Sequence, residues 1–434
     1  MTNKAEGVLN VYMNGRQVGD FRKQSSGALE FSYTAEWLND GKGAISYSLP
    51  LRAEKYQGAV VNNYFENLLP DNDQIKSYLA AQTQAKGTDA FSLLKEIGAD
   101  CVGALMFLDE GKKPSFVKKA VEINGTPISD TDISHILKNL KLAPLGMSDD
   151  EFRISIAGAQ EKTGLLRYDD QWYRPIGATA TTHIIKTQLG TLPNGIDLSD
   201  SVENEHFCLE FCKNLGFKVA ETKIWNFDGI RALVVRRFDR LLAGSKLYRL
   251  PQEDMCQALS YPPNLKYQTD GGPSVHQIAR LLNAANVPER DRLVLLKAQF
   301  VFWLLRATDG HAKNFSISFL PNGGFELSPL YDVLSAEPAY RNGQIQQNRT
   351  KLAMSIGQRN HWQFEKITKR HFLETATACG MDASCVESEL QQMSRLTKDA
   401  LKATKASVDD LVNFELAQQI AEGAQQRADE YLSF

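Results

Sequence analysis

The sequence DGHAKN, residues 309–314, directly follows an apolar run at residues 293–305 and directly precedes the alternating residues 315–318. The run is apolar nearly all round, which predicts a buried helix, and the alternation predicts a strand. Asp309 and Asn314 are five residues apart, which is the spacing of the catalytic aspartate and the metal-binding asparagine in protein kinases. The stretch therefore predicts a catalytic loop held on a rigid helix. An ordinary Asp-Gly turn is the alternative for this motif alone.

A second carboxylate, Asp332, follows Asn314 by eighteen residues. In protein kinases an aspartate beyond the catalytic loop holds Mg²⁺ against the β- and γ-phosphates. Carboxylate and amide oxygens are hard ligands of the kind that Mg²⁺ prefers. Asp309, Asn314 and Asp332 are therefore the candidate catalytic residues for phosphoryl transfer, with Asp309 facing the acceptor hydroxyl.

A lysine, Lys186, ends the apolar strand predicted at residues 182–186. Lysine is costly in such a place unless it points at anions such as phosphates. Glu205, nineteen residues further on, is the candidate ion-pair partner, because a buried carboxylate needs a cation. An exposed lysine at the end of the strand is the alternative.

A helix is expected over residues 201–215, because apolar residues recur at 208, 211, 212 and 215. Glu205 lies three residues before Cys208 and so falls on the buried face of this helix. Asp200 and Glu203 fit a capping box, which would commit Glu203 to the start of the helix. Glu203 nevertheless remains the second candidate for pairing with Lys186.

A loop of small residues, Ala-Gly-Ala at 157–159, is expected between two strands. The alternation at 152–156 predicts a strand that enters the loop, and residues 165–168 lead out of it. Small side chains permit close backbone approach to phosphates, and Lys162 adds positive charge. The loop matches neither the P-loop, which would need glycine where Glu161 stands, nor the glycine-rich loop of kinases.

The first 110 residues or so are predicted to be β-rich, with an Asn14-Gly15 hairpin turn. We expect strands at 8–13, 16–21, 29–33 and 44–49, and helices at 61–69 and 75–82. The polar passage 109–114 is a plausible boundary. The last 70 residues or so are predicted to form three amphipathic helices, among them 386–404 and 408–432.

Composition excludes several classes of protein. The 434 residues are 43% hydrophobic and 23% charged, which is ordinary for a globular chain. No stretch reaches the ~18 apolar residues of a membrane helix, and residues 1–7 lack the apolar core of a signal peptide. The six cysteines form no CxxC pair; Cys208 and Cys212 are expected to be buried free thiols, and a cytoplasmic location is expected.

Charge is distributed unevenly along the chain. The net charge of −3 argues against tight nucleic-acid binding by the chain alone. Residues 341–371 nevertheless carry seven Arg and Lys against one acid, Glu365, for a local charge of +6. A solvated loop and a contact with an anionic partner or substrate are the two interpretations of this basic stretch.

Taken together and in this order, the motifs resemble the HipA family, the serine/threonine-kinase toxins of bacterial toxin–antitoxin pairs. The resemblance rests on residues 152–163, 182–186, 237–240, 250–257 and 307–315, and upstream on residues 67–71, 96–98 and 102–104. The resemblance covers most of the chain, and this combination of motifs is specific for the family.

The resemblance implies an α+β fold, in which a small, barrel-like β-rich N-terminal domain precedes a bilobal protein-kinase-like domain. The expected parts are the N-terminal domain at 1–110, a connecting segment at 111–147, a kinase N-lobe with phosphate loop and hinge at 148–245, and a largely helical C-lobe with the catalytic loop at 246–434.

The resemblance also implies ATP and Mg²⁺ as cofactors. Asp309 would be the general base, and Asn314 and Asp332 would hold Mg²⁺. The residues expected to contact ATP are Ala157, Gly158, Ala159, Gln160, Glu161, Lys162, Lys186, Arg236, Arg237, Phe238, Asp239, His311, Lys313 and Tyr331. Of these, residues 236–238 would form the hinge that binds adenine through its backbone, and Asp239 would hold the ribose.

Ser155 matches the serine that the family autophosphorylates, a modification that ejects the phosphate loop and silences the kinase. The physical reason is repulsion, because a phosphoserine carries about −1.5 to −2 charges beside a loop meant for ATP phosphates.

The resemblance further implies partners. Members act with a dimeric helix-turn-helix antitoxin, HipB, and the pair represses its own operon. Family substrates are aminoacyl-tRNA synthetases, the glutamyl enzyme above all, and their phosphorylation arrests growth and produces persistence. After the family-like sequence KRHFL at 369–373, however, the positions expected to carry basic DNA-contacting side chains are Thr377 and Gly380. Operator DNA is therefore expected to be contacted through the antitoxin.

Two other functions remain as alternatives. One is a catalytically silent co-repressor, against which the presence of Lys186, Asp309, Asn314 and Asp332 argues. The other is a kinase of a small molecule, because nothing in these motifs identifies the acceptor.

Overall fold

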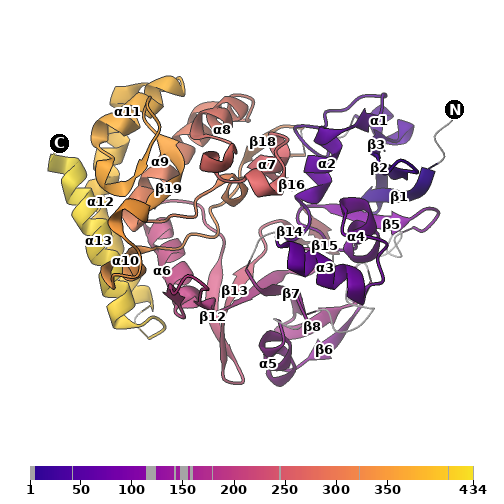
Figure 1. The fold of residues 1–434 in the computed structure, drawn as a ribbon, viewed down its shortest axis with the longest axis horizontal. Coiled ribbons are helices and arrows are strands. Elements are labelled where there is room, and N and C mark those ends of the chain that lie inside the picture. Colours follow the sequence, from indigo (N-terminus) through magenta and orange to yellow (C-terminus); the bar gives the residue numbers. More distant parts are fainter. Residues whose placement is uncertain are drawn as a thin grey trace.

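The computed structural model describes residues 5–41, 43–113, 124–140, 143–146, 155–156, 160–177, 179–243, 246–321, 323–408 and 410–433. The chain forms an N-terminal domain, a sheet-based lobe and a helical lobe, in that order (Figure 1). The N-terminal domain and the C-terminal helices lie at opposite ends of the molecule, and the sheet-based lobe lies between them. The predicted α+β fold is confirmed.

The N-terminal domain is built on an antiparallel sheet in the order β4-β3-β2-β1-β5. Its strands are β1 (Ala5–Met13), β2 (Arg16–Gln24), β3 (Leu29–Tyr33), β4 (Tyr56–Gln57) and β5 (Leu105–Asp109). Asn14 and Gly15 have φ values of 46° and 83°, which confirms the predicted hairpin turn. Among the described strands, β4 and β5 are the two edges, so the sheet is open.

Four helices complete this domain, namely α1 (Ala35–Asn39), α2 (Ala59–Glu66), α3 (Asp73–Gln82) and α4 (Ala90–Ile97). Phe21 of the sheet stacks on Phe65 of α2 with ring centroids 4.0 Å apart, inside an apolar core of its own. The helices predicted near 61–69 and 75–82 are confirmed. The strand predicted at 44–49 is wrong, because the backbone N–H of Tyr47 donates to the Glu253 carboxylate instead of to a neighbouring strand.

The sheet-based lobe contains a six-stranded sheet in the order β12-β13-β9-β7-β8-β6. The strands are β6 (Gly125–Ile128), β7 (Lys162–Tyr168), β8 (Gln171–Pro175), β9 (His183–Thr187), β12 (Thr222–Phe227) and β13 (Ile230–Arg236). The segment 111–147, predicted to be a connection, supplies β6 and helix α5 (Asp130–Lys138) to this lobe. Two small hairpins accompany the sheet, β10 (Gly190–Thr191) with β11 (Asp197–Leu198) and β14 (Arg240–Ala243) with β15 (Lys246–Arg249).

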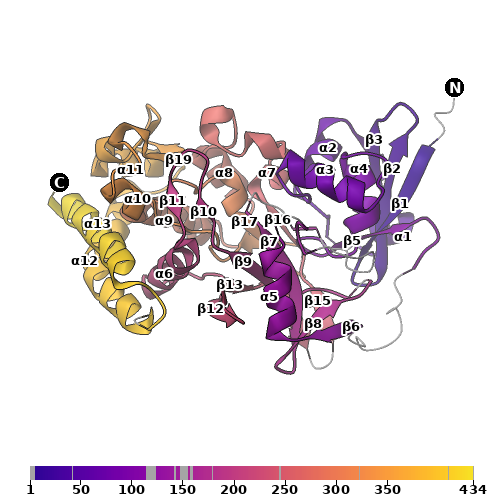
Figure 2. The same ribbon diagram turned by 60° about the horizontal axis from the view of Figure 1, so that its bottom comes forward.

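Helices cover both faces of this sheet, as the turned view of Figure 2 shows. Helix α5 packs on the face that carries Ile185 and Val234. Helix α6 (Ser201–Asn214) packs on the face of Leu233 and Val235. Lys186 pairs with Leu233 across the strands and so lies on the α6 face.

The start of α6 corrects one prediction. The helix predicted at 201–215 is present, but the Asp200 side chain makes no capping hydrogen bond. Glu203 accepts a hydrogen bond from Gln188 at 2.8 Å and pairs with Arg231. The capping box is therefore wrong, because both groups near Glu203 come from neighbouring strands or loops that compete for its carboxylate.

The helical lobe is mostly α-helix with short strands. Its helices are α7 (Met255–Ala258), α8 (Val275–Leu282), α9 (Pro288–Leu305), α10 (Glu337–Arg341), α11 (Lys369–Ala378), α12 (Ala383–Val408) and α13 (Phe414–Ser433). Its strands are β16 (Gln252–Asp254), β17 (Ser316–Phe319), β18 (Phe325–Leu327), β19 (Lys351–Ile356) and β20 (His361–Gln363). Short 3-10 turns lie at Pro263–Leu265, Gln268–Asp270, Ala312–Asn314, Gln347–Arg349 and Phe364–Lys366.

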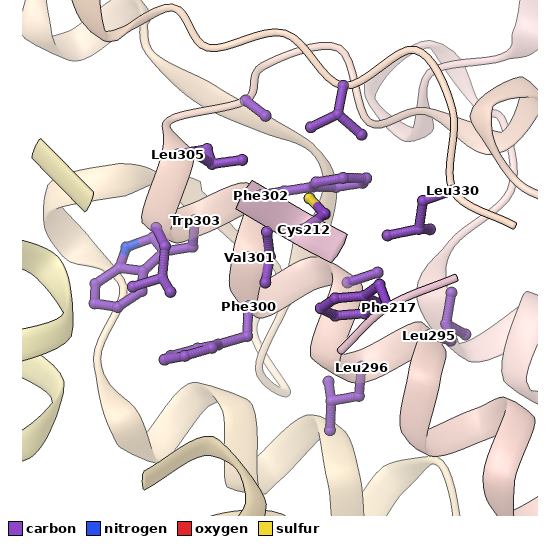
Figure 3. Close-up of a cluster of buried hydrophobic side chains, with 14 of the residues drawn as sticks. Cys212, Phe217, Leu295, Leu296, Phe300, Val301, Phe302, Trp303, Leu305 and Leu330 are labelled. Atoms are coloured by element: carbon purple, nitrogen blue, oxygen red, sulfur yellow. The ribbon is translucent and has the colours of Figure 1, made fainter. Parts of the chain in front are cut away.

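Helix α9 forms the centre of this lobe. Phe300, Val301, Phe302 and Trp303 point from it in different directions into one apolar cluster (Figure 3), and each is at most 2% exposed. The predicted buried helix at 293–305 is confirmed. It gives the following loop a rigid base.

The basic stretch 341–371 is partly neutralised. Arg341 pairs with Glu337 and Glu422, Lys369 with Glu387 and Arg370 with Glu374. Cys208 and Cys212 are buried free thiols, as predicted. None of the helices in the described ranges combines the length and apolarity that crossing a membrane requires.

Candidate active site

The predicted catalytic loop follows directly from the buried end of α9. Arg306, with φ of 51°, ends the helix and turns the chain. A Cβ atom on Gly310 would lie 2.3 Å from a ring carbon of Phe302, so only glycine fits this close approach. Nδ2 of Asn314 donates to the backbone oxygen of Asp309 at 2.7 Å. The loop thus brings Asp309 and Asn314 together.

The carboxylate of Asp309 is 58% exposed and can be reached by an acceptor hydroxyl. The Tyr267 hydroxyl donates a hydrogen bond to its Oδ1. Nε2 of the buried His311 lies 3.8 Å from the same oxygen, and burial lowers the pKa of His311. An accessible carboxylate on an anchored loop next to a neutral histidine is suited to accept a proton.

Asp332 lies beside the catalytic loop with φ of 54°. Left-handed backbone is uncommon outside glycine, and such strain is concentrated at functional sites. Nδ2 of Asn314 lies 3.5 Å from the backbone oxygen of Asp332. Because the amide nitrogen of Asn314 faces backbone carbonyls, its oxygen and the Asp332 carboxylate are available as hard ligands, and this pair fits Mg²⁺.

Lys186 lies in a buried group of charges that we call the catalytic cluster, consisting of Lys162, Lys186, Glu205 and Asp332. Nζ of Lys186 is 2.8 Å from Oε1 of Glu205 and also contacts the Asp332 carboxylate. The predicted pairing with Glu205 is present, and the alternative partner Glu203 is bound elsewhere. Burial alone would lower the pKa of Lys186, but Asp332 and Glu205 raise it above its ordinary value. Lys186 is therefore charged.

Lys162 of β7 lies directly opposite Lys186 of β9, so both side chains share one face of the sheet. Burial lowers the pKa of Lys162 to about 8, although Asp332 opposes this effect. Like charges at directly opposed positions repel each other, and a bound anion relieves that repulsion. Because the Asp332 side chain is 36% exposed, this side of the cluster is open to solvent.

The phosphate loop is described only at its ends, because Ala157, Gly158, Ala159 and most of the strand predicted at 152–156 lie outside the described residues. Gln160 donates to the backbone oxygen of Thr187 at 3.0 Å, and Glu161 is half-buried beside it. Ser155 is fully buried and belongs to no strand. Its hydroxyl donates to the backbone oxygen of Leu68 at 2.6 Å, in the N-terminal domain.

The predicted hinge residues divide into an exposed and a buried group. Arg236 is exposed and pairs with Glu221. The next residues enter a second group of charges, the interdomain cluster, made of Asp100, Arg237, Asp239, Arg240 and Arg249. Both oxygens of Asp239 are bound there, by Arg237, by Arg240 and by the backbone N–H of Gly103. We therefore do not propose a ribose contact for Asp239.

Lys313, predicted to contact ATP, points into the N-terminal domain. Its ammonium group donates to Oδ1 of Asn67 at 2.6 Å and lies 3.3 Å from Asp71 and 3.2 Å from Asp254. Burial would lower the pKa of Lys313, but the two carboxylates raise it. Lys313 fastens the catalytic loop to the N-terminal domain, and we propose no phosphate contact for it.

Tyr331 and Phe238 form an apolar wall on the α6 face of the sheet. Their ring centroids are 5.8 Å apart, and both rings pack against the cluster that contains Leu233 and Val235. The Tyr331 hydroxyl donates to the backbone oxygen of Lys313 at 2.7 Å. The two tilted rings offer an apolar surface next to the charged groups.

Sequence reasoning did not identify four residues that support the site, namely Asn67, Asp71, Asp100 and Tyr267. Asn67 and Asp71 lie within the sequence NLLPD at 67–71, which entered only through the family resemblance. Nothing in the sequence indicated Asp100 or Tyr267, because each acts through residues that are distant along the chain.

Comparison with known proteins agrees with this geometry. The chain matches two family descriptions, the HipA N-terminal domain over residues 9–108 and the HipA-like C-terminal domain over residues 154–401. It is 35% identical to “Putative kinase Y4mE” of Sinorhizobium fredii over 355 residues, which are 81% of each chain. It is 26% identical to the serine/threonine-protein kinase toxin HipA of Shewanella oneidensis, over 76% of this chain and 75% of that protein.

A solved structure shows the same fold. The HipA of Shewanella oneidensis, in its complex with HipB and operator DNA, superposes with a TM-score of 0.81 at 22% identity and covers 98% of both chains. The family matches, the 35% identical relative and this fold lead to one conclusion: the chain belongs to the HipA family of serine/threonine-kinase toxins.

Proposed function

We propose that this protein is an ATP- and Mg²⁺-dependent serine/threonine protein kinase that acts as the toxin of a toxin–antitoxin pair. The observation that carries the proposal is the catalytic cluster beside the catalytic loop. Two lysines on adjacent strands face a strained, partly exposed Asp332, and Asn314 bridges that residue to Asp309. Phosphoryl transfer needs chiefly such positioning and charge neutralisation.

Each part has a chemical role in this proposal. Lys186 and Lys162 hold the phosphates of ATP, and Asn314 and Asp332 hold Mg²⁺. Bound Mg-ATP supplies the γ-phosphoryl group and neutralises the charge that develops on it. Asp309 accepts the proton of the acceptor hydroxyl. Phe238 and Tyr331 form one wall for the adenine ring, and the backbone at 236–238 remains the proposed hinge.

We also propose that Ser155 is the site of self-inactivation. Ser155 is fully buried, and its hydroxyl is bound to Leu68. A phosphoryl group of about −1.5 to −2 charges would have to displace these buried surroundings, so the modified segment is expected to leave this position.

The proposed partners follow from the family. A HipB-type antitoxin dimer would neutralise the kinase and carry the pair to operator DNA, because Thr377 offers a hydroxyl and Gly380 no side chain where basic residues would be needed. The proposed substrate is an aminoacyl-tRNA synthetase in the cytoplasm, with the glutamyl enzyme as the first candidate. A kinase of a small molecule is the alternative, because the geometry does not identify the acceptor.

The test is a transfer assay. The phosphatase-treated protein is incubated with Mg-ATP and, one at a time, purified aminoacyl-tRNA synthetases, and each synthetase is weighed by intact mass spectrometry. The proposal predicts one added phosphate on a synthetase serine. Asp309→Ala should lower that transfer by roughly 10²–10⁴-fold. If no protein gains phosphate, while a small hydroxyl compound added to the assay is phosphorylated in an Asp309-dependent way, the acceptor is a small molecule.

A further inference from the structure

Asn314 does not fix the carboxylate of Asp309, the proposed general base. Asn314 holds the backbone oxygen of Asp309 and not its carboxylate. With 58% of the side chain exposed, rotation about its bonds would cost little unless another group fixed it. Among the described residues, the hydrogen bond that the carboxylate receives comes from the hydroxyl of Tyr267.

Tyr267 is itself fixed to the catalytic loop. Its ring lies edge-on to His311, with centroids 4.9 Å apart and an interplanar angle of 87°. The backbone oxygen of the preceding residue, Lys266, accepts a hydrogen bond from the N–H of Ala312 at 3.2 Å. The Lys266 ammonium lies 3.1 Å from Asp71 of the N-terminal domain. Tyr267 therefore moves with the loop that carries Asp309.

The turn after Tyr267 is equally constrained. The N–H of Gly272 donates to the backbone oxygen of Tyr267 at 2.9 Å. A Cβ atom on Gly272 would lie 2.0 Å from the backbone oxygen of Leu265, so glycine alone permits this close turn. Burial and the charge of Asp309 raise the pKa of Tyr267, so the phenol keeps its proton and acts as the donor.

We propose that Tyr267 is a positioning residue that orients the Asp309 carboxylate for proton transfer. The inference rests on the proposed kinase function. Tyr267 binds Oδ1 and so presents Oδ2 to the acceptor hydroxyl. The alternative is that the Tyr267 hydroxyl is itself a phosphate acceptor. Its fixed position argues against this, because an acceptor must move relative to the base as the phosphate is transferred.

The decisive variant is Tyr267→Phe, which removes only the hydroxyl and keeps the ring against His311. A hydrogen bond to a charged group is stronger than one between neutral groups. We therefore expect its loss to lower the single-turnover transfer rate by about 10- to 100-fold. The Kd for Mg-ATP should stay within about twofold, because the lost hydroxyl contacts Asp309 and the ring keeps its place against His311.

Tyr261→Phe is the matched control. Tyr261 precedes the same segment, and its hydroxyl accepts a hydrogen bond from Gln277 at 2.7 Å, away from Asp309. This variant loses one tyrosine hydroxyl and should keep the wild-type transfer rate. In a protein that already carries Asp309→Asn, Tyr267→Phe should not lower the transfer rate further, because Tyr267 acts through the Asp309 carboxylate.

The outcomes separate the two claims. Wild-type or faster transfer by Tyr267→Phe overturns the positioning role, and so does phosphate mapped to Tyr267 in the wild type. If Asp309→Asn also retains full transfer, the proposed base itself fails. If Asp309→Asn is inactive while Tyr267→Phe is normal, only the inference about Tyr267 fails.

Discussion

The two buried charge clusters of this molecule contain similar residues but differ in how their charges are arranged and in how far they are exposed. In the interdomain cluster, both oxygens of Asp100 are bound, by three arginines and by Thr181. Every charged side chain in that cluster is at most 4% exposed. In the catalytic cluster, Lys162 and Lys186 lie side by side, and Asp332 remains 36% exposed.

The difference shows what each cluster does. In the interdomain cluster the oxygens of both carboxylates are bound by arginines, and the cluster joins Asp100 of the N-terminal domain to residues 237–249. A cluster with adjacent cations and one open carboxylate gains from binding an anion and a metal. Burial and charge alone therefore do not separate the two clusters; the opposed lysines and the partly exposed carboxylate do.

The largest expected effect comes from breaking the interdomain cluster. Asp100→Asn removes the negative charge that Arg237, Arg240 and Arg249 share, and removing one member of a buried ion pair typically costs about 3–5 kcal/mol. Unfolding in urea should show this loss. Asp169→Asn, at an exposed turn, is the control and should change stability by less than about 0.5 kcal/mol. A loss below about 1 kcal/mol for Asp100→Asn would show that the cluster is not structural.

Breaking the open cluster should affect activity more than stability. Lys186→Met removes a preorganised cation from the proposed phosphate site, so phosphoryl transfer should fall by about 10²–10³-fold. The free energy of unfolding should fall less than in Asp100→Asn. Burial raises the pKa of Glu205, so this carboxylate can take up a proton and become neutral when Lys186 is removed. Lys223→Met, on the exposed part of β12, serves as the control for losing a lysine. Full activity of Lys186→Met would contradict this division of roles.

A buried acid outside both clusters extends the comparison, because Glu253 has no ion pair with the described residues. It accepts hydrogen bonds from Ser46 and from the N–H of Tyr47, and burial raises its pKa to about 8. The folded state therefore holds a proton that the unfolded state releases near pH 4.5. Stability should fall as pH rises from about 4.5 to 8, by at most about 1.4 kcal/mol per pH unit from this group.

Urea unfolding of the wild type and of Glu253→Gln across this pH range checks the effect. The glutamine variant should lose the part of the slope that Glu253 contributes. Identical slopes for the two proteins would mean that Glu253 does not retain its proton on folding.

The smallest effect is expected at Arg236, next to the buried Arg237. Its pairing partner, Glu221, is 73% exposed, and Arg236 itself is 61% exposed. Exposed pairs of this kind contribute about 0–1 kcal/mol, so Arg236→Ala should leave the unfolding midpoint nearly unchanged. Arg237→Ala, measured beside it, should be several-fold more destabilising. Equal losses of stability in the two variants would contradict the distinction between an exposed and a buried arginine.

Much of the fold could be predicted from the sequence, because the signals were local. The Asn14-Gly15 turn, the apolar period of α6 and the apolar run of α9 each specify an element through nearby residues. The pairing of Lys186 with Glu205 was also predictable, since a helix face and a strand end in sequence proximity brought them together.

The contacts between the domains could not be predicted. Lys313 looked like a phosphate ligand, but its ammonium group binds Asn67, 246 residues away. Asp239 looked available for a ribose, but Arg237, Arg240 and the backbone N–H of Gly103 bind both of its oxygens. Residues 44–49 were predicted to form a strand, but the N–H of Tyr47 donates to Glu253. Only the docking of the N-terminal domain decides these partners, and no local pattern records it.

The most direct test of the account is the intact mass, with peptide mapping, of the phosphatase-treated wild type and of Asp309→Ala after incubation with Mg-ATP. We predict one added phosphate, at Ser155, in the wild type and none in the variant. The same gain in both proteins would contradict the role of Asp309, and no gain in either, with ATP bound, would contradict an active, self-limiting kinase.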